Sequence, residues 1–265
     1  MGRYRAILSD LDGTVNRGNV LIEGVRTAYE ELSGKGIRWL FLSNNAAALA
    51  PDIARNIVRL GVHVQEDQVI NSASALIHTV KKDYRGARVL VVGEARLLQG
   101  LEEAGAIIEQ DPMVTDIVVT ALDTTFTYDK LKRAHVALQH GALFWATNLD
   151  ATYPVPNGFL PGAGSIAASV GCAAGRPPDR VFGKPSPDMA FLAMEMLHLP
   201  ANECLVVGDR METDVLFARN AGMASALVLT GATSRSDLQD FGYHPDHVIP
   251  SLADLPDLLA GLGER

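Results

Sequence analysis

Short apolar runs alternate with helix-like stretches along the whole chain, and this alternation limits the fold more than any other feature. The runs are nearly continuous in Val, Leu, Ile and Phe, which is typical of strands buried on both faces of a parallel sheet. The stretches between them carry helix signals, such as the early proline and final glycine of APDIARNIVRLG. We therefore expect an α/β fold with a three-layer, Rossmann-like core around a parallel sheet. Its predicted strands include residues 4–9, 37–45, 203–209 and 224–231.

The spacing of the polar strand ends predicts an inserted domain. Only residues 13–42 separate Asp12 from Ser43, which is room for one helix and one strand. By contrast, residues 44–183 separate Ser43 from Lys184, and this segment has predicted strands of its own. We expect a core domain in two parts, interrupted by an α/β cap domain. The predicted boundaries are 1–79 and 179–265 for the core and 80–178 for the cap.

Carboxylates follow the first predicted strand and a late one. Asp10 ends the stretch YRAILSD, Asp12 lies two residues further on, and Asp209 follows CLVVG. Ligands of open parallel sheets bind beyond the carboxyl ends of the strands, so these side chains are expected in one crevice. Two close carboxylates repel, and a hard cation such as Mg²⁺ would relieve that repulsion. Asp10 is then a candidate nucleophile and Asp12 a candidate acid and base.

Other polar residues at the same predicted edge suit a phosphate group. Ser43, Asn44 and Asn45 offer a hydroxyl and two amides, and Lys184 offers a positive charge. Each of them alone would pass for a helix cap or a solvated surface residue. Their order along one chain favours a joint site. Asp214 could either orient metal-bound water or cap the helix that it starts.

Charge and composition exclude several partners. The formal net charge of -8 at pH 7 argues against nucleic acid and against an anionic membrane surface. No apolar run reaches the roughly 18 residues of a membrane helix. The two cysteines, Cys172 and Cys204, lie far apart and are expected as buried thiols of a cytoplasmic protein.

The segments DLDGT, LSNN, GKPSPD and GDRMETD resemble the motifs of the haloacid dehalogenase superfamily, in that family's order. The middle of the chain resembles the NagD-like or 4-nitrophenylphosphatase branch, subfamily IIA, whose cap lies between the second and third motifs. The resemblance implies a Mg²⁺-dependent phosphatase that hydrolyses small phosphate monoesters through an aspartyl-phosphate. Caps of this branch often dimerise, so a homodimer is an open expectation.

The resemblance also implies residue roles. Asp10 would be nucleophile and metal ligand, Asp12 the acid and base with its carbonyl on the metal, and Asp209 the third ligand. Ser43 and Lys184 would hold the phosphate, helped by the neighbouring amides. Two groups are expected around them, namely Thr14 and Asp214 behind the ligands, and Thr125, Asn148 and Asp150 as specificity residues of the cap.

Three other functions compete with a phosphatase. A receiver-like signalling module also uses acids, a hydroxyl and a lysine at strand ends, but it lacks the 140-residue gap and an acid two residues beyond the phosphorylated one. A phosphotransferase or mutase on the same core would pass the phosphoryl group to an alcohol. A sugar-phosphate binding protein without activity is disfavoured, because every proposed catalytic position is filled.

Overall fold

The computed structural model describes residues 4–46, 48–155 and 158–263. The chain divides into two compact units. The core unit takes the chain up to Ser43, then Ala50–Ile70, and everything from Lys184 onward. The cap unit takes Asn44–Leu49 and Asn71–Gly183. Each unit is built around its own sheet, with helices on both faces.

The core unit contains a sheet of six strands within the described residues, in the order β15-β14-β13-β1-β4-β5. The pairs from β15 through to β4 are parallel. The sequence order therefore runs outward from β1 in both directions, which is the doubly wound pattern. The strands are β1 (Ala6–Asp10), β4 (Arg38–Ser43), β5 (Val69–Asn71), β13 (Cys204–Gly208), β14 (Ala224–Val228) and β15 (His247–Ile249).

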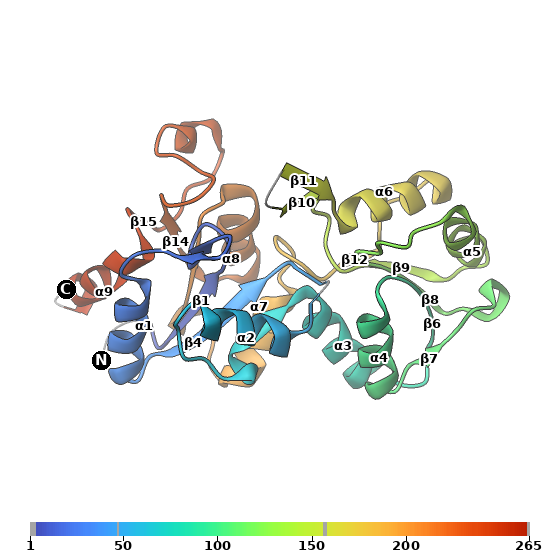
Figure 1. Ribbon diagram of the computed structural model, residues 1–265, viewed down its shortest axis with the longest axis horizontal. Helices are drawn as coiled ribbons and strands as arrows, with labels where there is room; N and C mark the ends of the chain where they lie inside the picture. Colours follow the sequence, from blue (N-terminus) through green and yellow to red (C-terminus); the bar gives the residue numbers. More distant parts are fainter. Residues whose placement is uncertain (1–3, 47, 156–157, 264–265) are drawn as a thin grey trace. The chain divides into compact units, whose positions relative to one another are not determined.

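Helices cover both faces of the core sheet (Figure 1). One face carries α1 against α9, and the other carries α7 against α8. A short antiparallel hairpin, β2 (Asn16–Arg17) and β3 (Val20–Leu21), follows β1. The helices are α1 (Val25–Gly34), α2 (Ala50–Arg59), α7 (Asp188–Leu197), α8 (Leu216–Ala221) and α9 (Leu255–Gly263).

The central strands are buried on both faces, as their apolar composition predicts. Ile7, Leu8 and Leu42 have no exposed surface, and each such side chain stabilises the fold by about 1.5–3 kcal/mol. A buried polar side chain of β1, Ser9, accepts a hydrogen bond from the indole nitrogen of Trp39 at 2.8 Å. The strands can therefore be buried without an unpaired polar group beside the indole.

The cap unit has a five-stranded sheet within the described residues, in the order β12-β9-β8-β6-β7. All its pairs are parallel. Figure 1 shows α5 and α6 on one face and α3 and α4 on the other. The elements are α3 (Ser72–Asp83), β6 (Arg88–Val92), α4 (Ala95–Glu103), β7 (Ile107–Ile108), β8 (Ile117–Thr120), α5 (Tyr128–Gln139), β9 (Leu143–Ala146), α6 (Ala163–Ala174), β12 (Arg180–Val181) and an antiparallel hairpin of β10 (Thr152–Val155) with β11 (Gly158–Pro161).

The two units begin and end at other residues than the sequence predicts. The predicted boundary 79/80 falls inside α3, which is one continuous helix of the cap unit. The boundary 178/179 falls before β12, whose residues pair with Trp145 and Ala146 of β9. A helix and a sheet edge belong to the unit that they pack in, so the cap unit extends further in both directions.

The cysteine prediction is half right. Cys204 is buried at the start of β13, and burial raises the pKa of its thiol to about 11. Cys172 is exposed on α6, so the expectation of a buried thiol there was wrong. Among the described residues, no helix has both the length and the apolar character that a bilayer crossing requires.

Candidate active site

Three carboxylates meet beyond the carboxyl ends of two neighbouring core strands. Asp10 ends β1 and Asp209 follows β13, and these strands pair in parallel with Ser9 opposite Val207. Asp214 lies five positions after Asp209, in a short π-helical turn, Met211–Val215. Each of the three residues offers a carboxylate oxygen, and these oxygens lie within 4.8 Å of one another. The expected meeting of the two strand ends is present in the fold.

Lys184 supplies the positive charge of this cluster. Its ammonium group donates to the Oδ1 atoms of Asp10 and Asp214, the latter at 2.6 Å. The side chain is only 3% exposed. Burial alone would lower the pKa of Lys184, but the two carboxylates outweigh it and hold that pKa above the ordinary value. Lys184 is therefore a fixed cation at this strand edge.

The cluster nevertheless holds more negative charge than its burial favours. Burial, with Asp214 and Asp209 nearby, raises the pKa of Asp10 to about 8, although Lys184 opposes the shift. Burial and the Asp214 carboxylate also raise the pKa of Asp209. Both shifts have the sign expected of buried, crowded carboxylates, and a further cation beside them would oppose both shifts.

Asp209 has an oxygen ready for such a cation. Its Oδ2 accepts the backbone N–H of Ala232 at 2.6 Å, while its buried Oδ1 has no hydrogen-bond partner in the described part of the chain. Buried carboxylate oxygens are rarely left without a partner. Asp10 and Asp209 thus fit a hard divalent cation, which takes oxygen ligands.

Asp214 is less suited to be a ligand, because its oxygens are already engaged. Its Oδ1 accepts from Lys184, and its Oδ2 accepts the N–H of Arg210 at 3.1 Å and the hydroxyl of Thr213 at 3.3 Å. It therefore accepts a backbone N–H at the start of the helical turn and pairs with the lysine, while a role toward metal-bound water stays a prediction. A methyl group at Gly208 would collide with the Asp214 carboxyl group, so only glycine fits there.

Asp12, unlike the buried carboxylates of the cluster, lies in a solvent-exposed environment. Its Oδ1 accepts a hydrogen bond from the amide of Asn16 at 3.1 Å. The chain turns tightly after Asp12, at Gly13. Gly13 has a φ of +89° and lies against Asp209, which leaves no room for a side chain. Asp12 is thus an accessible carboxylate held beside a buried cluster, which suits proton transfer.

Comparison with known proteins shows the family of this chain. The model for haloacid dehalogenase-like hydrolases matches residues 7–107, and a HAD-hydrolase-like model matches 181–255. The chain is 34% identical to an acid sugar phosphatase of Staphylococcus aureus over 262 residues, which is 99% of each chain. The chain belongs to the haloacid dehalogenase-like hydrolases. It is a phosphatase of the NagD-like branch, as the family resemblance predicts.

Two further relatives of this hydrolase are also phosphatases by name. The sugar-phosphatase AraL of Bacillus subtilis is 36% identical over 252 residues, 95% of this chain and 92% of AraL. The crystal structure of a 4-nitrophenylphosphatase from Thermotoga maritima superposes with a TM-score of 0.89 at 34% identity, covering 96% and 97% of the two chains. The similarity extends over both units.

The remaining predicted residues of the hydrolase's core unit lie near the strand ends. Ser43 ends β4 and is buried, with its predecessor Leu42 opposite Asp10 in the register. Thr14 is fully buried in the turn after β1, where its N–H donates to the Leu11 carbonyl at 3.2 Å. Its hydroxyl has no partner within the described residues.

The other predicted residues belong to the cap unit. Asn44 and Asn45 begin the first cap segment, and the Asn44 amide donates to Asp150 at 3.3 Å. Asn148 is buried in the loop after β9. The Thr125 hydroxyl donates to Asp123 at 2.8 Å and accepts from Lys130 at 2.7 Å, so it is part of a local turn. Their roles toward substrate stay predictions.

Sequence reasoning missed the loop after β14. Thr230 donates its hydroxyl to the Gly13 carbonyl at 2.6 Å, and the N–H groups of Ala232 and Thr233 reach Asp209. These contacts come mostly from backbone, so no side-chain chemistry announces them. The glycine in LTGATS is the one available signal, because a side chain at Gly231 would collide with Asp209.

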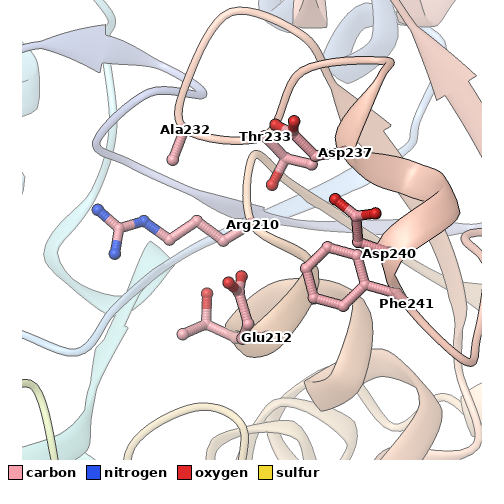
Figure 2. Close-up of a pocket in the computed structure, with 8 residues that line it drawn as sticks. Arg210, Glu212, Ala232, Thr233, Asp237, Asp240 and Phe241 are labelled. Carbon is pink, nitrogen blue, oxygen red and sulfur yellow. The ribbon is translucent and has the colours of Figure 1, made fainter.

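The same loop forms one wall of a hollow in the core unit of about 420 Å³. Figure 2 shows Arg210 and Glu212 on one side of it and Asp237, Asp240 and Phe241 on the other. Arg210 follows Asp209 directly, and Ala232 lines the hollow while its N–H holds Asp209. The segment after β14 therefore borders both the acidic cluster and this neighbouring space.

Proposed function

We propose that this phosphatase is Mg²⁺-dependent and hydrolyses small phosphate monoesters, sugar phosphates among them, through a phosphoryl group carried on Asp10. The observation that carries the proposal is the meeting of Asp10, Asp209 and Lys184 at one strand edge with the Oδ1 of Asp209 unpartnered. A small site with two ligand carboxylates and one fixed ammonium group matches the charge of a phosphate monoester with a divalent cation.

Asp10 and Asp209 would hold the cation, with the backbone carbonyl of Asp12 as a further oxygen donor. When bound, Mg²⁺ neutralises the carboxylates and the phosphate oxygens. Asp214 keeps Lys184 directed into the cluster, and Lys184 and Ser43 would hold the oxygens of the transferring group. Such fixed donors stabilise the charge of the transition state without reorganising.

In the first step an oxygen of Asp10 attacks phosphorus, and the ester P–O bond breaks. The electron pair of that bond leaves with the alcohol oxygen, which takes a proton from Asp12. In the second step Asp12, now a carboxylate, removes a proton from water as the water oxygen attacks phosphorus. The bond between phosphorus and Asp10 breaks, and inorganic phosphate and the free carboxylate of Asp10 are restored.

Sugar phosphates are proposed as the substrate class because two relatives with 34% and 36% identity are named sugar phosphatases. A panel of monoesters tests this point: hexose and pentose phosphates, glycerol phosphate, phosphoglycolate, a nucleotide and 4-nitrophenyl phosphate. We expect the highest kcat/KM with a sugar phosphate, and a loss of at least ~100-fold when EDTA replaces Mg²⁺. Undiminished turnover in EDTA would contradict the metal, and a preference for nucleotides would contradict the substrate class. In the presence of methanol, equal yields of alcohol and inorganic phosphate would indicate hydrolysis. A yield of inorganic phosphate below that of the alcohol would indicate transfer to methanol.

Asp12→Asn tests the proton-transfer role. We expect kcat to fall by ~10²–10⁴-fold, because asparagine can neither protonate the leaving oxygen nor take a proton from water. Leaving groups of low pKa, such as 4-nitrophenol, should be affected least in the first step. Stopped-flow release of nitrophenol measures this step. Asp67→Asn, an exposed carboxylate of the same unit, is the control. Intact turnover by Asp12→Asn would remove the assignment.

A further inference from the structure

The side-chain amide of Asn16 is fixed against the carboxylate of Asp12. Its Nδ2 atom donates to the Oδ1 of Asp12 at 3.1 Å and to the carbonyl of Gly18 at 2.8 Å. A carbonyl oxygen and a carboxylate oxygen are both acceptors, so the NH₂ end of the amide, and not its oxygen, faces them. The two contacts use both hydrogens of the NH₂ group. The amide therefore has little freedom to rotate, and one of its hydrogens is directed at Asp12.

The backbone of Asn16 contacts the same turn at two further points. Its N–H donates to the Leu11 carbonyl at 3.0 Å, and its carbonyl accepts the N–H of Gly13 at 2.7 Å. The N–H of Gly13 lies in the same planar peptide as the Asp12 carbonyl, so this bond restricts the orientation of that carbonyl directly. Asn16 is only 8% exposed, whereas Asp12 is an exposed residue. A buried residue thus holds both the backbone and the carboxylate of Asp12.

The strand that carries Asn16 is itself attached to the core unit. Asn16 and Arg17 form β2, which pairs with β3. The Nε of Arg17 donates to the Thr230 carbonyl at 2.8 Å, and a second nitrogen of the guanidinium donates to the same oxygen. The Thr230 hydroxyl in turn donates to the Gly13 carbonyl. The position of the Asn16 amide is therefore supported by contacts of the neighbouring residues, as a positioning group requires.

We propose that Asn16 is a positioning residue for Asp12, and this inference rests on the proposed function. The amide engages Oδ1, so Oδ2 is the oxygen that gives a proton to the leaving alcohol and later takes one from water. A neutral carboxyl group with its proton on Oδ2 keeps Oδ1 as an acceptor, so the amide holds the side chain in both protonation states. An exposed aspartate without this contact would exchange rotamers, and a proton donor acts only within hydrogen-bond reach of the oxygen that it protonates.

Asn16→Leu tests the inference, since leucine is similar in shape but has no donor. The readout is kcat/KM, which reports the steps up to cleavage of the ester bond, for two substrates. The alcohol of a hexose phosphate needs a proton as it leaves, whereas 4-nitrophenolate leaves without one. We expect kcat/KM to fall about tenfold for the hexose phosphate and less than twofold for 4-nitrophenyl phosphate. Equal losses for both substrates, or no loss for the hexose phosphate, would overturn the inference.

A double-mutant cycle with Asp12→Ala shows whether the amide acts through Asp12. Because the two side chains are in contact, Asn16→Leu should change hexose phosphate hydrolysis by less than about twofold once Asp12→Ala is present. An undiminished loss in that background would contradict the positioning role. Asn56→Leu is the matched control, because it removes an asparagine of the same unit whose Oδ1 accepts from Arg59 at 3.0 Å. It should leave both values of kcat/KM unchanged.

Mg²⁺ binding is measured separately, because damage to the acidic cluster would also lower activity. We expect Mg²⁺ to raise the Tm of Asn16→Leu as much as that of the unaltered enzyme, since Asp10 and Asp209 are untouched. Loss of that rise would assign the lower activity to the metal and overturn the inference. If Asn16→Leu does not fold, as circular dichroism would show, Asn16→Ala removes the same donor without a branched side chain and is measured in its place.

Failure of the proposed function gives a different result from failure of the positioning role. If Asp12→Ala alone leaves hexose phosphate hydrolysis intact, the proposed proton transfer falls and the positioning role with it. If Asp12→Ala is impaired and Asn16→Leu is not, only the positioning role falls.

Discussion

Replacing Asp10 with asparagine is expected to lower kcat by at least ~10⁴-fold, because an amide is a poor nucleophile toward phosphorus. No variant of another residue should reduce phosphate release further. The assay is release of inorganic phosphate from the best substrate of the panel. Asp129→Asn, which removes an exposed carboxylate from the cap unit, is the control and should retain full activity. A reduction of less than tenfold would show that Asp10 does not receive the phosphoryl group.

Although Asp10→Asn should abolish activity, it should make the stability of the metal-free enzyme less sensitive to pH. In the metal-free folded protein, burial raises the pKa of Asp10 to about 8, whereas its ordinary pKa in the unfolded chain is 3.8. Between these values the folded state binds more protons, so the metal-free enzyme loses stability as the pH rises from about 4 to 8. Asp10→Asn should lose less over this window. Thermal unfolding in EDTA at pH 5 and pH 8, with and without added Mg²⁺, measures both differences, and Mg²⁺ should restore stability at the higher pH.

Lys184→Met is expected to be the most destabilising single change in the cluster. It removes the cation that pairs with Asp10 and Asp214 while leaving both carboxylates buried. Breaking a buried pair from one side costs about 3–5 kcal/mol, which corresponds to a fall in Tm of about 10 °C for a chain of this size. Activity should fall by ~10²–10³-fold even where the variant is folded, because a donor to the transferring group is lost.

Lys35→Met provides the matched comparison for this loss. Lys35 pairs with Glu31 on the surface of α1, and both side chains are largely exposed. Such a pair contributes at most about 0.5 kcal/mol, so the Tm should hardly move. If Lys184→Met were as stable as Lys35→Met at pH 8, the ammonium group would not be the counter-charge of this cluster.

The apolar alternation in the sequence was sufficient to predict the central strands. The predicted strand over residues 4–9 overlaps β1, and CLVVG coincides with β13. This works because a strand buried on both faces is apolar at nearly every position, and the carboxylate at its carboxyl end marks the edge of the sheet. Asp10 and Asp209 could therefore be placed together before any coordinates existed.

Contacts between separate segments could not be predicted in this way. Asp214 pairs with Lys184 across 30 positions, and a periodic pattern carries no information on which side chains of different elements meet. The backbone donors after β14, Ala232 and Thr233, were missed because every residue except proline has a backbone N–H, so the sequence does not indicate which of them meet Asp209. Cys172 was wrongly expected to be buried because AGSIAASVGCAA has no polar stripe that would orient α6.

The strand order of the core sheet has a consequence for synthesis on the ribosome. Ala6 of β1 pairs with Cys204 of β13, so translation of the whole cap segment comes between the two partners. Until Cys204–Gly208 emerges, the nascent β1 lacks the neighbour on that side, and an open strand edge invites aggregation. A chain that stops before Asp209 holds Asp10 without the second proposed metal ligand. We therefore expect prematurely terminated chains to be inactive as phosphatases and to be substrates of chaperones.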